Sequence, residues 1–284
     1  MMKSSTVSPA HLATFAVSPS RPLRIALAVA VAFAVAPLHA QDAKSIVSAA
    51  VQRELAADRE DHTAYQYRDR DITPDHDTLY YTVETPQGTL RKKLEDHGHP
   101  LSAADRQADQ QRINILLADP AAQSRARKDA SHDDGEAEQM LRLLPQAFLW
   151  TVTNESGDIV TLDFKPDPNF SPSGFESKVL SAMGGQITVD RSENRIRSIK
   201  GTLLDDVTFF LGIGGRLHRG GSFEVQRREI VPGHWQMTES KVHIGGRALF
   251  FKSIGSQEDE FRSDFKPSNA QTLQQANEIL NQIH

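Results

Sequence analysis

The sequence predicts an α+β domain built on one large curved antiparallel sheet of about eleven strands, an incomplete barrel with a few covering helices. Short runs in which apolar and polar residues alternate follow one another over residues 147–255, and a period of two is typical of half-buried strands. Short turns separate these runs, and short connections favour antiparallel neighbours. Helical periodicity is confined to both ends and one internal segment, so we expect helices against one face of the sheet.

The first forty residues have the layout of a secretory signal peptide. They contain three basic residues, no acidic one, an apolar run over 25–36 and small or apolar residues before Ala40. The run is shorter than the ~20 residues that a comfortable transmembrane span needs. We therefore expect Sec-dependent export with cleavage near Ala40, and a mature domain of residues 41–284 in the periplasm with no stable membrane span. An uncleaved N-terminal anchor is the alternative.

Composition narrows the class of partner. The formal net charge is −5, and cleavage would remove only basic residues, so the mature domain is more acidic still. An acidic protein is poorly suited to covering phosphate backbones, and we expect no nucleic-acid partner. The chain has no cysteine, which leaves no disulfide and no thiolate metal site. Stability has to come from an ordinary hydrophobic core.

The first elements of the mature chain are a helix and three strands. Val47, Val51 and Leu55 recur every four residues and predict a helix over 44–60. The alternating runs that follow predict strands at 65–67, 79–83 and 89–94. A turn with Pro and Gly, residues 85–88, joins the last two strands.

A helical insertion over about 101–145 interrupts the strands. Ser102 and Asp105 resemble a capping box that opens a helix running to Asp119. Pro120 suits the first position of a second helix. Residues 120–136 are the most polar stretch of the mature chain, and we expect them to form a mobile helix-loop.

A long meander over 147–255 completes the sheet. Its alternating runs predict strands at 147–153, 158–164, 185–190, 195–203, 206–211, 222–230, 234–244 and 247–255. Turn residues such as Pro232-Gly233 and Gly245-Gly246 separate them. A C-terminal helix is expected over 270–282, with Ser268 or Asn269 as N-cap.

This order of elements is similar to that of the LolA-like, lipoprotein-sorting superfamily of envelope proteins. The segments that carry the resemblance are 184–190, 195–199, 206–209, 233–242 and 247–251. In that family a strand ending in Val-Asp leads into a strand of Ile-x-x-Ile pattern, as Val189-Asp190 and Ile196 to Ile199 do here. The resemblance implies an incomplete barrel whose concave side holds acyl chains or another apolar ligand under a helical lid. No ligand-contacting residue of the family matches a position of this chain.

Large apolar side chains recur on one face of several predicted strands. Five of them are candidate ligand contacts: Trp150, Phe164, Phe223, Trp235 and Phe251. Apolar residues on one face of a sheet have to be covered by helices or left facing a cavity. The few predicted helices are sparse cover for so wide a sheet, which favours a cavity. A filled helix-on-sheet core is the alternative.

The glycine-rich segment 212–221 is the sharpest local motif. It lacks the third glycine of a dinucleotide fingerprint and the Gly-Lys-Ser/Thr of a Walker loop, and no helix follows it to bind phosphate. We therefore expect a flexible loop at the rim of the sheet. Its Arg216, His218 and Arg219 are candidates for contact with an anionic head group or a partner protein.

No convincing catalytic or metal motif is present. His97 and His99 share the spacing of residues on one face of a strand, but a zinc site needs at least one further ligand, and their context is a turn. Ser263 and Lys266 spell S-x-x-K without the partner motifs of a β-lactamase-type site. We expect no catalytic residue, no metal and no cofactor.

The sequence thus favours a non-enzymatic periplasmic protein that binds an apolar or amphipathic ligand, such as lipid or the acyl chains of a lipoprotein, in the concavity of the sheet. One alternative is a protein-interaction or sensor module of the envelope that uses the glycine-rich segment and residues 120–136. The second alternative is a His-dependent metalloenzyme or hydrolase.

Overall fold

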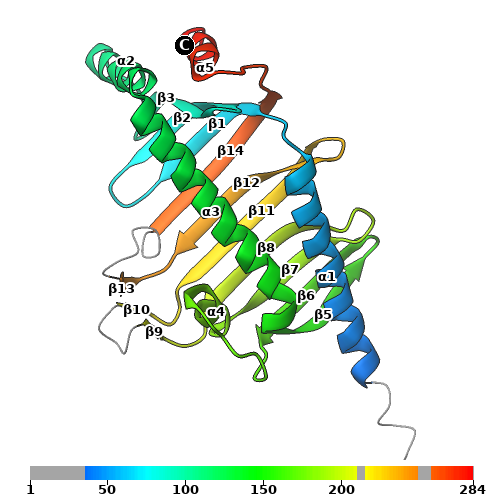
Figure 1. Ribbon diagram of the computed structural model, residues 1–284. Helices are drawn as coiled ribbons and strands as arrows, with labels where there is room; N and C mark the ends of the chain where they lie inside the picture. The colour runs from blue at the N-terminus through cyan, green and yellow to red at the C-terminus, as the bar shows by residue number, and fades with distance from the viewer. Residues whose placement is uncertain (1–35, 210–214, 249–256, 284) are drawn as a thin grey trace, which may run out of the picture. The chain divides into compact units, whose positions relative to one another are not determined.

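The computed structural model describes residues 36–209, 215–248 and 257–283. The chain divides into two compact units, 1–38 and 39–284, and the elements below lie in the second unit apart from the start of helix α1 (Ala36–Glu60). The described residues form five helices and fourteen strands, eleven of which make one antiparallel sheet that is not closed into a barrel (Figure 1). The predicted fold class, α+β with a large open antiparallel sheet, is confirmed.

The N-terminal strands form one side of the sheet. They are β1 (Tyr65–Ile72), β2 (Asp77–Thr85), β3 (Gly88–Asp96) and the short β4 (His99–Pro100). Each of the first three is longer than the apolar alternation in the sequence indicates. The turn before β3 places Gly88 at φ 126°, a backbone conformation that glycine adopts at little cost.

Two consecutive helices form the insertion, α2 (Ala103–Ala118) and α3 (Pro120–Ala147). Side-chain oxygens of Ser102 and Asp119 accept hydrogen bonds from the first turn of the helix that each precedes. The predicted second helix begins at Pro120, as expected, and only the loop part of the expected helix-loop over 120–136 was wrong, because the helix capped by Asp119 continues without a break. Residues 125–137 are exposed, in agreement with their polar sequence.

The meander supplies the other side of the sheet. Its elements are β5 (Phe148–Ser156), β6 (Ile159–Pro166), α4 (Phe175–Leu180), β7 (Met183–Asp190), β8 (Arg195–Leu203), β11 (Ser222–Val231) and β12 (His234–His243). A separate three-stranded sheet contains β9 (Val207–Phe209), β10 (Gly215–Leu217) and β13 (Gly246–Ala248). The helix α4 was not predicted from the sequence.

One strand joins the two sides. The order across the large sheet is β4-β3-β2-β1-β14-β12-β11-β8-β7-β6-β5, so β14 (Gln257–Pro267) lies between β1 and β12 (Figure 1). The sequence did not predict β14, because its residues are mostly charged and lack apolar alternation. The predicted strand over 247–255 begins within β13, and its residues 249–255 lie outside the described part of the chain.

The C-terminal helix is α5 (Leu273–Asn281), within the predicted range. Its N-cap is Thr272, whose hydroxyl oxygen accepts a hydrogen bond from the Gln275 amide at 3.2 Å. The predicted cap at Ser268 or Asn269 was therefore wrong. Ser268 instead accepts a bond from the Ala270 amide, a local turn that precedes the helix.

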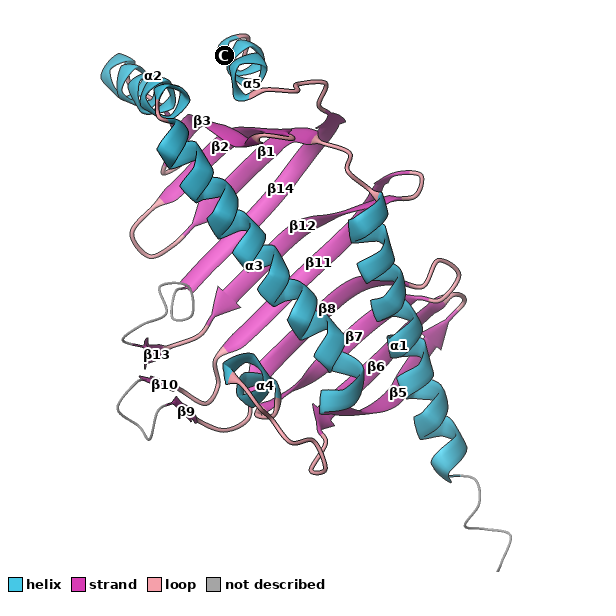
Figure 2. Cartoon of the chain, viewed as in Figure 1, coloured by secondary structure: helices cyan, strands magenta, loops and turns pink. Residues whose placement is uncertain are grey.

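Helices α1 and α3 cross the same face of the large sheet (Figure 2). Val47 and Val51 of α1 and Leu144 of α3 share one buried cluster with Leu162 and Ile187 of the meander. Helix side chains therefore fill the space over this half of the sheet, as apolar contact in a packed core requires.

A second, smaller core lies on the opposite face of the N-terminal strands. Strand register places Tyr81 and Leu90 on that face, where they pack with Ile113 of α2 and with Ala276 and Leu280 of α5. Helices α1 and α5 thus cover different faces of the same sheet.

Candidate functional site

The feature that best combines shape and chemistry is a cleft of about 280 Å³ between α1, α3 and the sheet. Its lining residues are Glu54, Leu55, Ala57, Asp58, Asp61, Asp134, Ala137, Glu138, Leu141, Arg195, Arg227, Trp235 and Gln236. Five of these carry carboxylates and two carry guanidinium groups, so the cleft is acidic. Helix α1 supplies one wall, α3 the other, and β8, β11 and β12 the floor.

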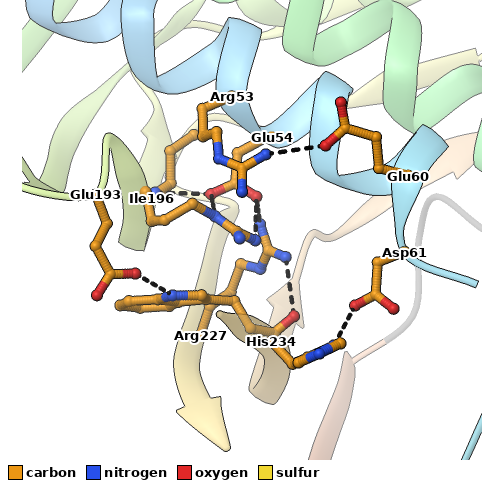
Figure 3. A network of polar contacts seen from close by, with 10 residues as sticks. Arg53, Glu54, Glu60, Asp61, Glu193, Ile196, Arg227 and His234 are labelled. Carbon is orange, nitrogen blue, oxygen red and sulfur yellow. Dashed lines mark hydrogen bonds and ion pairs between the residues drawn. The ribbon is translucent and has the colours of Figure 1, made fainter. Parts of the chain in front are cut away.

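A buried ion triad forms the base of the cleft (Figure 3). Glu54 Oε1 accepts hydrogen bonds from Arg195 Nε at 3.0 Å and from the Ile196 amide at 2.8 Å. Glu54 Oε2 accepts from Arg195 Nη2 at 3.0 Å and from Arg227 Nη1. Glu54 and Arg195 are only 4% and 3% exposed. Since an unpaired buried charge is costly, the triad fixes α1 on β8 and β11.

An aromatic ring lies beside the triad. The indole N–H of Trp235 donates to Glu193 Oε2 at 2.9 Å, which fixes the ring (Figure 3). The guanidinium carbons of Arg195 and Arg197 each lie 5.6 Å from the ring centre, within the range of cation–π attraction. Arg227 also donates to the Trp235 carbonyl oxygen at 3.3 Å. The Trp235 ring thus contacts two guanidinium groups of the protein itself.

Asp61 closes the outer end of the α1 wall. His234 Nδ1 lies 2.8 Å from Asp61 Oδ2, and the Thr63 amide donates to Asp61 Oδ1 at 3.0 Å. Burial alone would raise the pKa of Asp61, but the hydrogen bonds from Thr63 and His234 outweigh it and hold the pKa below its usual value. Asp61 is therefore a paired carboxylate.

Asp58 on α1 and Asp134 on α3 differ from the other acids of the cleft. Among the described residues, neither carboxylate has an ion pair or a hydrogen bond. Burial raises the pKa of Asp134, and the negative charges of Asp58 and Asp133 raise it further. The two walls of the cleft thus present like charges to each other, and a cation between them would relieve the repulsion.

Of the residues predicted to line a ligand cavity, Phe164 and Phe223 border a second cleft of about 470 Å³ on the sheet, beside Gly185 and Gly201. Trp150 and Phe164 are 4% and 5% exposed, and their rings pack against each other at 5.3 Å between centres. A Cβ added to Gly185 would lie 2.8 Å from the Phe164 ring, and one added to Gly201 would lie 2.5 Å from the Phe223 ring. Both rings therefore lie directly on glycine backbone. Trp235 lines the acidic cleft, and Phe251 lies outside the described residues.

The glycine-rich segment is partly ordered as strand. Gly215 to Leu217 form β10, paired on both sides, so the expectation of a loop throughout 212–221 was wrong for this part. Asp206 contacts two of these candidate residues. Its carboxylate accepts hydrogen bonds from the Arg216 guanidinium and from the Arg219 backbone amide. His218 Nδ1 lies 4.0 Å from Asp206 Oδ1. Arg216, His218 and Arg219 are all exposed.

The histidine motifs form no metal centre in the described part of the chain, where no group of three or more His, Asp or Glu could hold an ion. His97 and His99 are exposed at the β3–β4 turn, and His97 Nδ1 lies 3.1 Å from the Asp96 carboxylate. Ser263 and Lys266 lie in β14 and are exposed. These positions give the metalloenzyme alternative no support.

Sequence reasoning missed the residues that form the triad. Glu54 carried a signal, because it lies three residues after Val51 and so falls on the apolar stripe of the predicted helix, where a charge is out of place. Arg195 and Arg227 are 141 and 173 residues away from Glu54, and nothing in the sequence connects them.

Comparisons with known proteins do not identify a family for this chain. No family model matches this chain, and no curated protein matches it either. Among the described helices, none is long and apolar enough to cross a membrane. A solved structure, MucB in complex with MucA(peri), aligns over 79% of this chain and 100% of that chain, with 13% identity and a TM-score of 0.21. Agreement at that level establishes neither a shared fold nor a shared function.

Proposed function

We propose that this protein is a non-enzymatic binding module of the periplasm whose acidic cleft holds a basic side chain of a partner protein. The observation that supports it is the pair Asp58 and Asp134, which line opposite walls of the cleft without a partner among the described residues. An arginine or lysine placed between them would remove the like-charge repulsion and form charge-assisted hydrogen bonds to both. The periplasmic location rests on the predicted signal peptide.

The volume of the cleft and the aromatic residue on its floor fit a single basic side chain of a partner. Small-molecule sites usually measure roughly 300–1,000 Å³, and this cleft, at about 280 Å³, is at the lower limit. Trp235 lies on the floor with its ring fixed by Glu193, and aromatic faces attract guanidinium and ammonium groups. The cleft therefore fits one anchoring residue of a larger protein surface.

The proposal predicts that a cationic peptide binds and a neutral one does not. The probe is an N-acetylated Gly-Gly-Arg-Gly-Gly amide, compared with the same peptide carrying Gln, and binding is followed by NMR at the Trp235 indole N–H. The double variant D58N/D134N should weaken binding about tenfold, since each partly exposed charge pair contributes ~0.2–1 kcal/mol.

Asp129 provides the matched control, because it is an exposed aspartate of α3 outside the cleft. D129N should bind the arginine peptide as the wild type does. Equal affinity for the arginine and glutamine peptides would contradict the proposal, as would an unchanged affinity in D58N/D134N.

A lipid or lipoprotein acyl chain in the concavity of the sheet is the alternative ligand. Such a ligand needs open apolar surface, and although α1 and α3 pack onto part of the meander, a cleft of about 470 Å³ beside Phe164 and Phe223 is where it would bind. The unpartnered Asp58 and Asp134 are the observation that favours the protein partner. Native mass spectrometry of protein purified from its host separates the two, because a carrier retains lipid of defined mass.

A further inference from the structure

The base of the acidic cleft carries an excess of positive charge. Glu54 supplies one negative charge there, and Arg195 and Arg227 supply two positive charges. Arg195 is 3% exposed and donates to both carboxylate oxygens of Glu54. The side chain of Arg227 is 26% exposed, and it lines the cleft. The unbalanced positive charge is therefore open to a ligand at Arg227.

Arg227 has hydrogen-bond donors to spare. A guanidinium group carries five N–H donors. Arg227 uses Nη1 for Glu54 Oε2 and Nη2 for the Trp235 carbonyl oxygen at 3.3 Å (Figure 3). In the part of the chain that the structure describes, Arg227 donates to no other acceptor. A carboxylate suits the remaining donors, because its two oxygens accept paired hydrogen bonds from arginine.

The unpaired carboxylates lie about one helical turn away from this donor group. Glu54, which holds Arg227, and Asp58 are four residues apart on α1, and residues at this spacing share a helix face with Cβ atoms roughly 5–6 Å apart. Burial raises the pKa of Asp134, and the negative charge of Asp58 raises it further, so these two carboxylates lie near each other. The cleft thus offers donors for an anion at Arg227 and acceptors for a cation at Asp58 and Asp134.

Apolar side chains complete the lining of the cleft. They belong to Leu55 of α1, Leu141 of α3 and Trp235 of β12. Ala57 and Ala137 line the two helical walls, and their small side chains leave room between the helices. Lysine and arginine bury their methylene stems on apolar surface while the charged group stays among polar partners. The lining therefore matches a ligand in which a methylene stem separates a cation from a carboxylate.

We propose that the basic residue held in the cleft is the C-terminal residue of its peptide, with its side-chain cation between Asp58 and Asp134 and its α-carboxylate on Arg227. This inference rests on the proposed function and adds the identity of the chain end. A basic residue inside a chain brings no carboxylate of its own to Arg227. A small free amino acid does not span the two ends of the cleft, because its ammonium nitrogen and carboxyl carbon share one Cα and lie only about 2.5 Å apart.

Isothermal titration calorimetry on residues 41–284 tests the inference with N-acetylated peptides. The probe is Gly-Gly-Gly-Arg with a free C-terminal carboxylate, compared with the same peptide as its C-terminal amide. The free acid should bind about tenfold more tightly, because hydrogen bonds between charged groups are among the strong ones. Gly-Gly-Gly-Gln as the free acid should bind at least about tenfold more weakly than the arginine acid, because it brings no cation to Asp58 and Asp134.

A side-chain carboxylate beside an arginine has the same chemistry as a C-terminal one. The peptide Gly-Gly-Arg-Asp-Gly, acetylated and amidated, presents this second source. It should bind more weakly than the arginine free acid, because its carboxylate is placed on the next residue.

The matched variants are R227Q and R228Q. R227Q removes the proposed partner of the carboxylate, while Glu54 keeps both hydrogen bonds from Arg195 and no buried charge is left unpaired. It should bind the arginine acid and the arginine amide with equal affinity. Arg228 is the next residue on β11, exposed and outside the cleft, so R228Q should keep the tenfold preference.

The outcomes separate this inference from the proposed function. Equal affinity of the arginine acid and amide in the wild type would overturn the inference alone, since an amide that still binds more tightly than a glutamine peptide supports the function. A preference for the acid that persists in R227Q would also overturn it. Equal affinity of the Arg-Asp peptide and the arginine acid would assign the carboxylate to a side chain instead. If no arginine peptide binds, the proposed function fails as well.

Discussion

At the scale of single residues, buried charge distinguishes this protein. Glu54 and Arg195 are almost inaccessible to solvent, and they are tolerated because each carboxylate oxygen accepts two hydrogen bonds. One carboxylate serves two arginines, and the side chain of Arg227 is 26% exposed. The excess positive charge at the base of the cleft therefore lies close to the acidic walls that we propose for binding.

Removing the central charge of this triad should be strongly destabilising. E54Q keeps the shape of the side chain but leaves Arg195 and Arg227 without a counter-charge. Breaking a buried pair in this way costs about 3–5 kcal/mol in the free energy of unfolding, which urea denaturation measures. E60Q is the control on the same helix, because Glu60 and its partner Arg53 are exposed and their pair contributes under about 1 kcal/mol. Equal effects of the two substitutions would rule out the structural role assigned to the triad.

At the scale of elements, α3 is held mainly at its two ends, and its exposed middle contacts the sheet through Arg127, which donates to the Gln87 carbonyl oxygen at 3.4 Å. Its last turns carry Leu144 into the main core, and Gln123 near its start donates to carbonyls at the end of α2. Between them, residues 125–137 are exposed. A helical stretch that is polar on all sides gains little from packing and depends on local propensity.

The intrinsic helix propensity of its residues should therefore control the stability of this part of α3. Gly135 lies in the exposed middle, and a Cβ added there meets nothing within 4 Å. G135A should stabilise the helix by about 0.5–1 kcal/mol, because glycine loses more backbone entropy than alanine. Hydrogen exchange over 125–137 should slow by a few-fold, while α5 stays unchanged. Faster exchange in G135A would show that this stretch is held by something other than propensity.

The elements that sequence reasoning found and missed differ in one physical respect. Strands such as β6 and β7 have one buried apolar face and are bounded by turn residues, so period-two alternation and Gly or Asn identified them. Strand β14 is held by register with two neighbours, and its buried-side residues are Glu260 and Arg262, which produce no apolar pattern. The acidic cleft could not be predicted either, because Asp58 and Asp134 are far apart in the sequence and only the fold places them on facing walls.

At the scale of the whole molecule, the sheet is assembled from pieces far apart in the chain. Tyr65 of β1 pairs with Pro267 of β14, whereas β5 and β6 form a local hairpin in which Phe148 pairs with Pro166. Closing a long loop costs entropy before the contacts it permits are gained. The hairpins of the meander should consequently form before β1 and β14 meet.

This order of assembly can be measured with two phenylalanine substitutions. Phe265 packs on Tyr67 with 5.0 Å between ring centres, and Phe148 packs on Phe164 at 4.6 Å. F265A removes contacts of the late β1–β14 junction, so we expect it to lower stability by about 2 kcal/mol and to speed unfolding about thirtyfold with little change in the folding rate. F148A removes contacts of an early hairpin and should slow folding instead. Stopped-flow kinetics on residues 41–284 distinguish these outcomes, and slower folding in F265A would place the long-range junction in the folding nucleus.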